Sequence, residues 1–289
     1  LLARCPDMAV SCSHEVSPEI REFERTATTV LNALLVPVIA RYVTALRARL
    51  RDAQIAAPVY LIQSNGGAIS LDAAVQAPVK LLLSGPSGGV LAAQKLANTL
   101  TTPDVVGVDM GGTSYDVAVV AGGDRTVVTQ GEIDGLPVRV PMVEMNTIGA
   151  GGGSIAFVDP SGRLQVGPRS AGAVPGPVCY DRGGTEPTVT DVNLILGRLD
   201  AATFLGGRFA LDLDGARAAL RDRIELPLSL TPDHAAAGIL AVVNAKLAAS
   251  IKFSLFAKGL DPRDFALMSF GGAGGLHAIE VAEELGITQ

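Results

Sequence analysis

The chain has 289 residues, enough for one large domain or two smaller ones, and its 48% hydrophobic content supports a sizeable core. The formal net charge of −6 argues against nucleic acid or an anionic membrane as a partner, because both attract a basic surface. The sequence contains no run of about 18 uninterrupted apolar residues, so we expect no membrane span, and we also expect no signal peptide. The three cysteines lack disulfide-like or metal-like spacing, so we expect a cytoplasmic location.

The first part of the chain predicts a short strand followed by a long helical region. The run MAVSCSHEV (8–16) predicts the strand. Ser17-Pro18-Glu19 are typical of a helix start, with a Ser cap, Pro at the first helical position and an acid in the first turn. Apolar residues keep a helical period over 30–50, and Pro37 inside this run predicts a kink or two helices.

Strands and one helix follow. PVYLIQS (58–64) predicts a buried strand and VKLLLS (79–84) another strand, while residues 85–100 predict a helix with a glycine-rich first turn. Three further runs, joined by tight turns, predict an antiparallel meander over 104–110, 115–122 and 125–133.

The middle of the chain, about 134–207, is rich in Gly and Pro and predicts a compact insertion with one hairpin and then loops. A helix is expected to begin near 190, with Thr190 or Asp191 as its cap. Residues from 232 predict a helix of about seven turns. A buried strand over 265–272 and a last helix ended by Gly286 complete the pattern.

The turn in VDMGGTSYDVAVV (108–120) is the first candidate binding element. It lacks the Lys of a P-loop, and a strand rather than a helix follows it, which also excludes a dinucleotide-binding turn. A hairpin of this kind presents backbone N–H groups and a Thr hydroxyl to phosphate oxygens. Asp109 at its edge is placed to hold a hydrated Mg²⁺ or to orient a water. Taken alone, the motif equally describes a plain Gly-Gly hairpin, which is the commoner structure.

Two other glycine clusters link a strand to a helix. SFGGAGG (269–275) lies where backbone donors and the helix dipole favour an anion, and SGPSGG (84–89) has the same setting. Each is also explained by a tight turn or by close helix packing. The order of elements is nevertheless similar to the second half of the actin, Hsp70 and sugar-kinase superfamily of ATPases, in which two such turns contact the phosphates and the adenosine of ATP.

Within that superfamily, the chain most resembles the hydantoinase A / 5-oxoprolinase / acetone carboxylase family. The resemblance runs nearly from end to end and is carried by SHEVSPEIREFERTATTVLNA, QSNGG, LLSGPSGGV, VDMGGTSYDV, IGAGGGSIA, VGPRSAGAVPGPVCYDRGGTEPTVTDVNLILGRL and SFGGAGGLHA. Three positions depart from the family pattern: Tyr115 replaces Thr, Asp181 replaces Gly and Gly275 replaces Pro. None of these removes an expected phosphate ligand, although Gly275 is expected to loosen its turn.

The resemblance implies an α/β chain with an incomplete actin-like (ribonuclease H-like) ATPase fold. Residues 1–84 would be the remainder of the first half, and 85–100 a helix that crosses between the halves. Residues 101–289 would be the second half, with an insertion over about 134–230. The family's first phosphate loop and its final segment are missing from this sequence. We therefore expect a piece of a longer enzyme, inactive by itself.

The resemblance also implies an activity: ATP-dependent hydrolysis of a cyclic amide such as hydantoin, 5-oxoproline or a lactam, with ATP activating the carbonyl. Mg²⁺ would accompany ATP, and a B-type subunit is a possible partner. Asp109 and Thr113 are the expected catalytic residues, with Asp109 also a metal ligand. The expected ATP contacts are Gly111, Gly112, Thr113, Ser114, Gly271, Gly272 and Gly274.

Other residues are assigned structural roles. Asp116 is expected to face away from Asp109 or to lie in the turn. His277, Cys179 and Asp191 are expected to be structural, with Cys179 buried and Asp191 capping a helix. GAGGGS (149–154) would line a cleft between domains or act as a hinge.

Three alternatives to the amidohydrolase remain: a ketone carboxylase subunit of the same family, a sugar-kinase-like or chaperone-type ATPase, and a structural subunit whose glycine loops no longer bind ATP. The SAGAVPGPVCYDRGG block does not fit a sugar kinase, no peptide-binding domain is evident, and the intact Asp-x-Gly-Gly-Thr motif argues against lost binding.

Overall fold

The computed structural model describes residue 4, residues 8–133 and residues 135–289. Residues 1–3, 5–7 and 134, the last being the start of the predicted insertion, lie outside the described residues. The chain forms two compact units. Unit 1 is Leu1–Lys95 with Arg125–Glu144, and unit 2 is Leu96–Asp124 with Met145–Gln289. The predicted crossing helix is α4 (Ser84–Leu100), which contributes residues to both units.

Unit 1 consists of helices and short antiparallel pairs. Its helical elements are α1 (Ser13–Val16), α2 (Glu22–Asp52), α3 (Leu71–Gln76) and the 3-10 turn η1 (Pro78–Leu81). Its pairs are β1 (Tyr60–Ile62) with β2 (Ala68–Ser70), β6 (Val127–Val128) with β9 (Met142–Val143), and β7 (Gly131–Ile133) with β8 (Leu136–Val138). Its small hydrophobic core is formed by Val16, Val79, Val138, Val140 and Met142.

Several predictions for unit 1 are wrong. Residues 8–16 form no strand, because the chain folds there into α1, whose Val16 enters the core. Ser17 is the last cap of α1 rather than the first cap of α2, which begins at Glu22 after Arg21. Helix α2 runs through Pro37 as one helix, so the alternative of two helices is wrong.

The two predicted strands of unit 1 also differ from expectation. The first is reduced to β1, which is not buried, because it pairs only with β2 and leaves Tyr60 61% exposed. Residues 79–84 contain η1 instead of a strand. The backbone N–H of buried Val79 donates to Oδ1 of Asn32 on α2 at 3.2 Å, so a side chain takes the place of a neighbouring strand.

In the described part of the chain, two helices, α2 and α8 (Pro232–Phe256), are long and apolar enough by length and composition to cross a membrane. This differs from the expectation based on uninterrupted apolar runs. It is weak support for a membrane location, since core helices of soluble proteins meet the same criterion, and half of the apolar window in α8 is buried within the protein.

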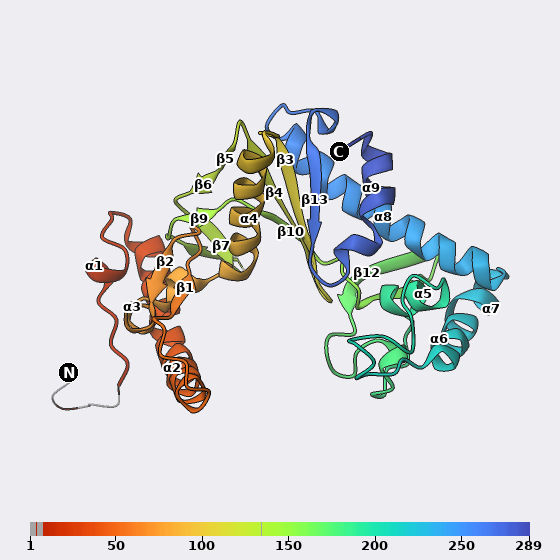
Figure 1. Cartoon of the computed structure of the whole chain (residues 1–289), viewed down its shortest axis with the longest axis horizontal. Helices are drawn as coiled ribbons and strands as arrows, with labels where there is room; N and C mark the ends of the chain where they lie inside the picture. Colours follow the sequence, from red (N-terminus) through yellow and green to blue (C-terminus); the bar gives the residue numbers. More distant parts are fainter. Residues whose placement is uncertain (1–3, 5–7, 134) are drawn as a thin grey trace. The chain divides into compact units, whose positions relative to one another are not determined.

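Unit 2 is built on a sheet with the order β10-β4-β3-β13 (Figure 1). The strands β3 (Val105–Met110) and β4 (Tyr115–Ala121) form the predicted antiparallel hairpin, and β13 (Ala266–Phe270) pairs in parallel with β3. The predicted third strand of the meander is wrong as a single element: β5 (Asp124–Arg125) pairs with β4, but β6 and β7 pair elsewhere. Strand β10 (Asn146–Ile148) occupies the other edge of β4.

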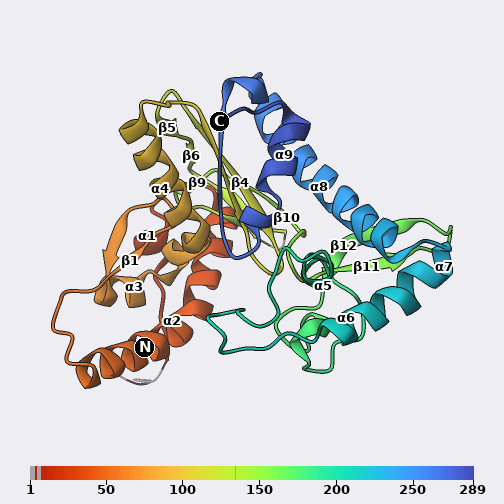
Figure 2. The same cartoon turned by 45° about the vertical axis from the view of Figure 1, so that its right-hand side comes forward.

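Long helix α8 supplies much of the core of unit 2. It packs against β4, β12 and α9 (Ala278–Leu285), as Figures 1 and 2 show. Its buried side chains include Ile239, Leu247, Ile251 and Leu255, which join Val106 and Val108 of β3 in one cluster. The predicted seven-turn helix from 232, the last helix and its left-handed Gly286 are confirmed. Strand β13 is confirmed but only partly buried.

Unit 2 also contains the predicted hairpin, β11 (Ser154–Val158) with β12 (Leu164–Ser170), and several short helical elements. They are η2 (Val178–Tyr180), α5 (Val189–Ile195), α6 (Leu213–Leu220), the π-helical η3 (Arg221–Glu225), α7 (Leu226–Leu228), η4 (Pro262–Asp264) and η5 (Gly274–Leu276) (Figure 2). The cap of α5 is Thr188, not Thr190 or Asp191. Asp191 lies at the third helical position and completes a capping box.

Candidate functional site

The Asp-x-Gly-Gly-Thr turn connects β3 to β4 with four residues. Strand register pairs Met110 with Tyr115, and the N–H of Gly111 donates to the Ser114 carbonyl at 3.1 Å to close the turn. A Cβ added at Gly111 or Gly112 would meet nothing within 4 Å, so open space lies over the turn. Within the part of the chain that the structure describes, the N–H groups of Gly112 and Thr113 have no acceptor. The turn is therefore an open, donor-rich surface suited to an anion.

The glycine segment that follows β10 lies directly on this turn. Gly152 and Gly153 donate to the carbonyls of Gly111 and Gly112 at 3.0 and 2.6 Å. A Cβ at Gly151 would come within 2.7 Å of the Gly112 carbonyl group and the Thr113 nitrogen, so only glycine permits this approach. The segment supports the turn from within unit 2, a role that sequence reasoning missed although the run of glycines was visible.

The second predicted glycine cluster also reaches the hairpin. Parallel pairing places Phe270 of β13 beside Asp109, and Ala273 donates its N–H to the Met110 carbonyl at 2.9 Å. Gly271 has φ +84°, and a Cβ there would collide with Oδ1 of Asp109. The structure thus brings Gly271 against the carboxylate that the sequence singled out, because β3 and β13 end at the same edge of the sheet.

Asp116 faces the same side of the sheet as Asp109, so the prediction that it faces away is wrong. The two residues are direct cross-strand partners, and such partners share a face. The Thr147 hydroxyl donates to Asp116. Partial burial, and then the neighbouring Asp116 carboxylate, raise the pKa of Asp109. Across residue 4, residues 8–133 and residues 135–289, no group of three or more His, Cys, Asp or Glu side chains is placed to hold a metal.

A cavity of about 230 Å³ opens beside the turn. Its glycine border and apolar walls are formed by Gly111, Gly112, Gly152, Tyr180, Thr190, Asn193, Leu199, Phe204, Leu205, Gly272, Ala273 and Leu276, and we call it the glycine-bordered cavity. Of the predicted ATP contacts, it includes Gly111, Gly112 and Gly272. The others lie outside its lining: Gly271 and Gly274 pack on the hairpin, and the Thr113 hydroxyl lies 3.4 Å from that of Ser170.

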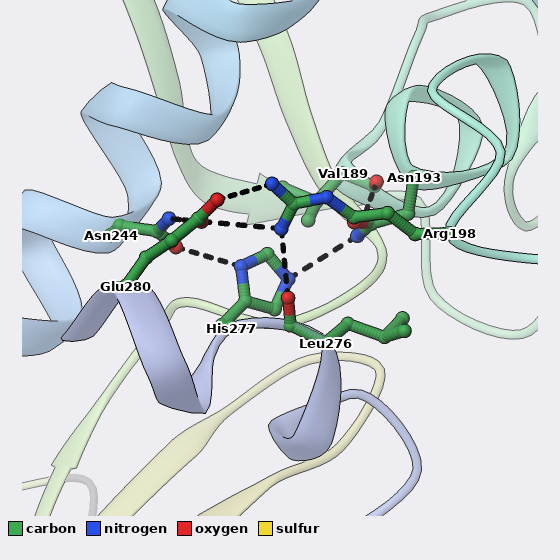
Figure 3. Close-up of polar contacts among 7 residues, drawn as sticks. All are labelled: Val189, Asn193, Arg198, Asn244, Leu276, His277 and Glu280. Atoms are coloured by element: carbon green, nitrogen blue, oxygen red, sulfur yellow. Dashed lines mark hydrogen bonds and ion pairs between the residues drawn. The ribbon is translucent and has the colours of Figure 1, made fainter. Parts of the chain in front are cut away.

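His277 lies behind this cavity in a buried polar network (Figure 3). Its Nδ1 is 2.7 Å from Oδ1 of Asn244, and its Nε2 is 3.2 Å from Nδ2 of Asn193. Burial first, and then the Arg198 charge, lower the pKa of His277 to about 4. Glu280 accepts hydrogen bonds from Arg198 and Asn244, and these, the Arg198 bond foremost, lower the pKa of Glu280. His277 is therefore neutral and buried near pH 7.

Cys179 and Asp191 are structural, as the sequence predicts. Burial, and then the Asp191 carboxylate, raise the pKa of the Cys179 thiol, which disfavours the nucleophilic thiolate. Asp191 accepts the backbone N–H groups of Cys179 and Thr188 at 2.7 and 2.8 Å. Sequence reasoning did not assign Thr190, Asn193 or the aromatic residues of the cavity wall to a site, because neither the motif over 166–199 nor the residues after it show which side chains face the turn.

Comparison with known proteins extends these observations. A model of the Hydantoinase/oxoprolinase family matches residues 25–289. The chain is 44% identical to the caprolactamase subunit alpha of Pseudomonas jessenii over 98% of its own length and 41% of that protein. It is 37% identical to 5-oxoprolinase of Saccharomyces cerevisiae over 96% of its length and 22% of that protein.

The fold also matches a solved structure. Nucleotide-free acetone carboxylase, from a study of ATP-dependent acetone carboxylation, superposes with a TM-score of 0.85 at 31% identity, over 95% of this chain and 39% of the other. The predicted actin-like ATPase fold is thereby confirmed. The chain spans about two fifths or less of the length of these relatives.

Proposed function

Since this chain belongs to the hydantoinase/oxoprolinase family, we propose that it is part of an ATP-dependent hydrolase of cyclic amides of the hydantoin, 5-oxoproline or lactam type. The observation that carries the proposal is the open Gly111–Gly112 turn, flanked by Asp109 and bordering an apolar cavity. An anion-binding turn beside an apolar pocket suits a reaction that joins a phosphate donor to a small ring.

The hairpin would hold the phosphates. The N–H groups of Gly112 and Thr113, which have no acceptor among the described residues, offer donors, and the absence of side chains at Gly111 and Gly112 lets phosphate oxygens approach. Thr113 would add its hydroxyl, with Ser114 closing the turn. Gly271 and Gly274 keep the neighbouring loop tight against β3, and Gly272 lines the cavity where a nucleoside would follow the phosphates.

Asp109 fits a magnesium ion bound with the nucleotide. Mg²⁺ is commonly held by one or two carboxylates together with substrate phosphates and waters, rather than by an all-protein cage. The Asp116 carboxylate beside Asp109 increases the negative potential at this edge of the sheet, and a cation would relieve their repulsion. Asp109 would orient the ion or its water toward the phosphate.

Activation of the amide follows from elementary chemistry. ATP supplies a phosphoryl group that, once on the amide oxygen, makes that oxygen a good leaving group. The chain's own contribution is to hold the phosphates on the hairpin and to keep the ring in a water-poor cavity beside them.

A ketone carboxylase of the same family is the second candidate, favoured by the superposition on acetone carboxylase. Activation of a ketone oxygen would use the same hairpin. Subunit designations among the relatives support a B-type partner subunit for either activity. A cytoplasmic location remains a prediction from the cysteine pattern.

Binding of Mg²⁺ with a non-hydrolysable ATP analogue, measured by calorimetry, tests the site. We expect binding by the chain, loss of its Mg²⁺ dependence in Asp109→Ala, and retention in the matched Asp104→Ala, a carboxylate of the same strand region that instead accepts the Gly122 N–H. Equal behaviour of the two variants would refute the assignment of Asp109.

Phosphate release by the complete enzyme separates the two activities. We expect stimulation by a lactam, hydantoin or 5-oxoproline. Stimulation only by a ketone with bicarbonate would replace the hydrolase with the carboxylase.

A further inference from the structure

One polar atom of a residue in the wall of the glycine-bordered cavity has no hydrogen-bond partner among the residues that the structure describes. Asn193 on α5 is 1% exposed, and its Oδ1 is buried without a hydrogen bond. Its Nδ2 is fully used, donating to the Val189 carbonyl at 3.0 Å and lying 3.2 Å from Nε2 of His277. Buried acceptors without partners are rare in folded proteins, because nothing replaces their lost hydration.

The orientation of the Asn193 amide is fixed by its neighbours. Rotating the amide by half a turn would point its oxygen at the Val189 carbonyl, and two acceptors repel each other. Nδ2 must therefore face Val189 and donate to Nε2 of His277. Because Nε2 accepts, Nδ1 carries the proton and donates to Oδ1 of Asn244.

The network continues to the ion pair that terminates it. Asn244 donates through Nδ2 to the Glu280 carboxylate, which is held by Arg198, and Arg198 also donates to the Leu276 carbonyl at 2.8 Å (Figure 3). The hydrogen bonds from Asn193 to His277, from His277 to Asn244 and from Asn244 to Glu280 all run in the same direction. The series begins at Asn193. Among the residues drawn in Figure 3, Oδ1 of Asn193 is the only side-chain acceptor that is buried without a hydrogen bond.

The unused oxygen belongs to a residue of the cavity wall. We propose that Oδ1 of Asn193 accepts a hydrogen bond from an N–H group of the ligand in the glycine-bordered cavity and thereby selects ligands that carry this donor. His277 is the positioning residue, since it holds Nδ2 and leaves Oδ1 as the available atom. Tyr180, Phe204 and Leu276 provide apolar surfaces for the ring that bears the donor.

Two ligands of the proposed function, on which this inference rests, carry such a group. One ligand is ATP, whose adenine carries an amino group, and the other is the cyclic amide, whose ring carries an N–H group. Both present a donor on a flat ring, and the experiment distinguishes them.

Binding to the chain is measured by calorimetry with two pairs of probes in the presence of Mg²⁺. ATP is compared with purine riboside triphosphate, in which hydrogen replaces the amino group and no N–H donor remains on the base, and a lactam is compared with its N-methyl derivative. We expect the donor-bearing member of one pair to bind about 10-fold tighter or more, because a buried acceptor rejects a ligand that leaves it unpaired. That pair identifies the source of the N–H group.

The variant Asn193→Leu should reduce this preference to within about twofold, because it removes the acceptor. Thr190→Val is the matched control. It alters the same wall, where the Thr190 hydroxyl already donates to the Gly152 carbonyl at 2.8 Å, and should keep the wild-type ratio. An unchanged ratio in Asn193→Leu, or no preference in either pair for the wild type, would overturn the inference.

If Asn193→Leu does not fold, the side-chain ¹³Cγ resonance of Asn193 in the wild type replaces it. The resonance should move with ATP but not with purine riboside triphosphate, or with the lactam but not with its N-methyl derivative, and equal movement within both pairs would overturn the proposal. Binding of ATP that depends on Asp109, together with preferences in both pairs that do not depend on Asn193, would refute this inference alone. Absence of binding by all four probes would refute it together with the proposed function.

Discussion

The paired carboxylates Asp109 and Asp116 show how one residue acquires its chemistry from another across a sheet. Both are part-exposed, and the pKa of Asp109 is raised because burial and the charge of Asp116 act on it together. The end of the strand-forming run placed Asp109 at the edge of the turn, whereas strand alternation put Asp116 on the wrong face. Alternation could not place Asp116, because register across the hairpin decides which residues share a face.

Removing the Asp116 charge should lower the pKa of Asp109. We expect Asp116→Asn to shift the carboxyl titration of Asp109 toward its ordinary value of about 3.9. Carboxyl ¹³C NMR measures it directly. Thr147→Val is the control, because it removes a hydrogen bond to Asp116 and keeps the charge. If Asp109 titrates alike in the wild type and Asp116→Asn, the like-charge repulsion is absent.

His277 makes a second prediction at this scale. Its folded-state pKa of about 4 lies below the ordinary value of 6.5, so the unfolded chain binds the extra proton first as the pH falls. Neutral His277 therefore makes its full contribution to the free energy of unfolding above about pH 6.5. This contribution, about 3 kcal/mol in total, is lost progressively as the pH falls toward 4.

Urea unfolding between pH 7 and 4 measures this loss. The variant His277→Gln should show a shallower decline above pH 4.5, the region in which Glu280 does not yet contribute its own acid loss. Identical slopes for the two proteins would show that His277 does not titrate differently on folding.

At the scale of elements, the start of α5 is held by a buried carboxylate. Asp191 accepts from Val178, Cys179 and Thr188, so it joins η2 to α5 as well as completing the capping box. Its truncation would leave three backbone donors unpaired. We expect Asp191→Ala to lower the free energy of unfolding by about 3 kcal/mol or more.

The matched change is Asp212→Ala, which removes the cap of α6 and one acceptor for the Gly215 N–H. Asp212→Ala should lower the free energy of unfolding by about 1 kcal/mol. Urea unfolding of both variants measures the two losses. Equal losses for the two variants would mean that the extra contacts of Asp191 contribute nothing.

The glycine segment supporting the hairpin gives another prediction for an element. Gly151→Ala would force a Cβ against the backbone of the turn, where no side-chain rearrangement can accommodate it. We expect about 2 kcal/mol of destabilisation and weaker Mg-ATP binding. Gly85→Ala should change neither, because a Cβ there meets nothing and the residue lies in helix α4. Thermal unfolding and calorimetry would compare them.

The end of η2 shows why the family pattern has a glycine at position 181. Asp181 replaces an expected Gly at the end of η2 and adopts φ +51°, a left-handed conformation that favours glycine. Asp tolerates this region better than most side chains. The resemblance thus marked a real backbone requirement, although the sequence carried no sign of the angle.

For the whole molecule, the two units have separate cores, one around Val79 and Val138 and the other around α8. We expect Ile239→Ala on α8 to cost about 2–5 kcal/mol and to lower hydrogen-exchange protection in β3 and β4 of unit 2. Leu34→Ala, which changes an apolar side chain that is 64% exposed, should cost almost nothing. Comparable losses from both changes would contradict the assigned core.

By itself, the sequence determined the family, the fold class, the glycine turn at 109–113 and the main helices, because these depend on local periodicity and on long motifs. Tertiary structure decided what contacts the turn: Gly151–Gly153 beneath it, Gly271 beside Asp109, and Asn193 with an unused oxygen in the cavity wall. These residues are far apart in the chain, and no local pattern encodes strand register or the buried hydrogen bonds that orient a side chain. The same reason explains the lost strand at 79–84, where Asn32, some 47 positions away, satisfies the backbone of Val79.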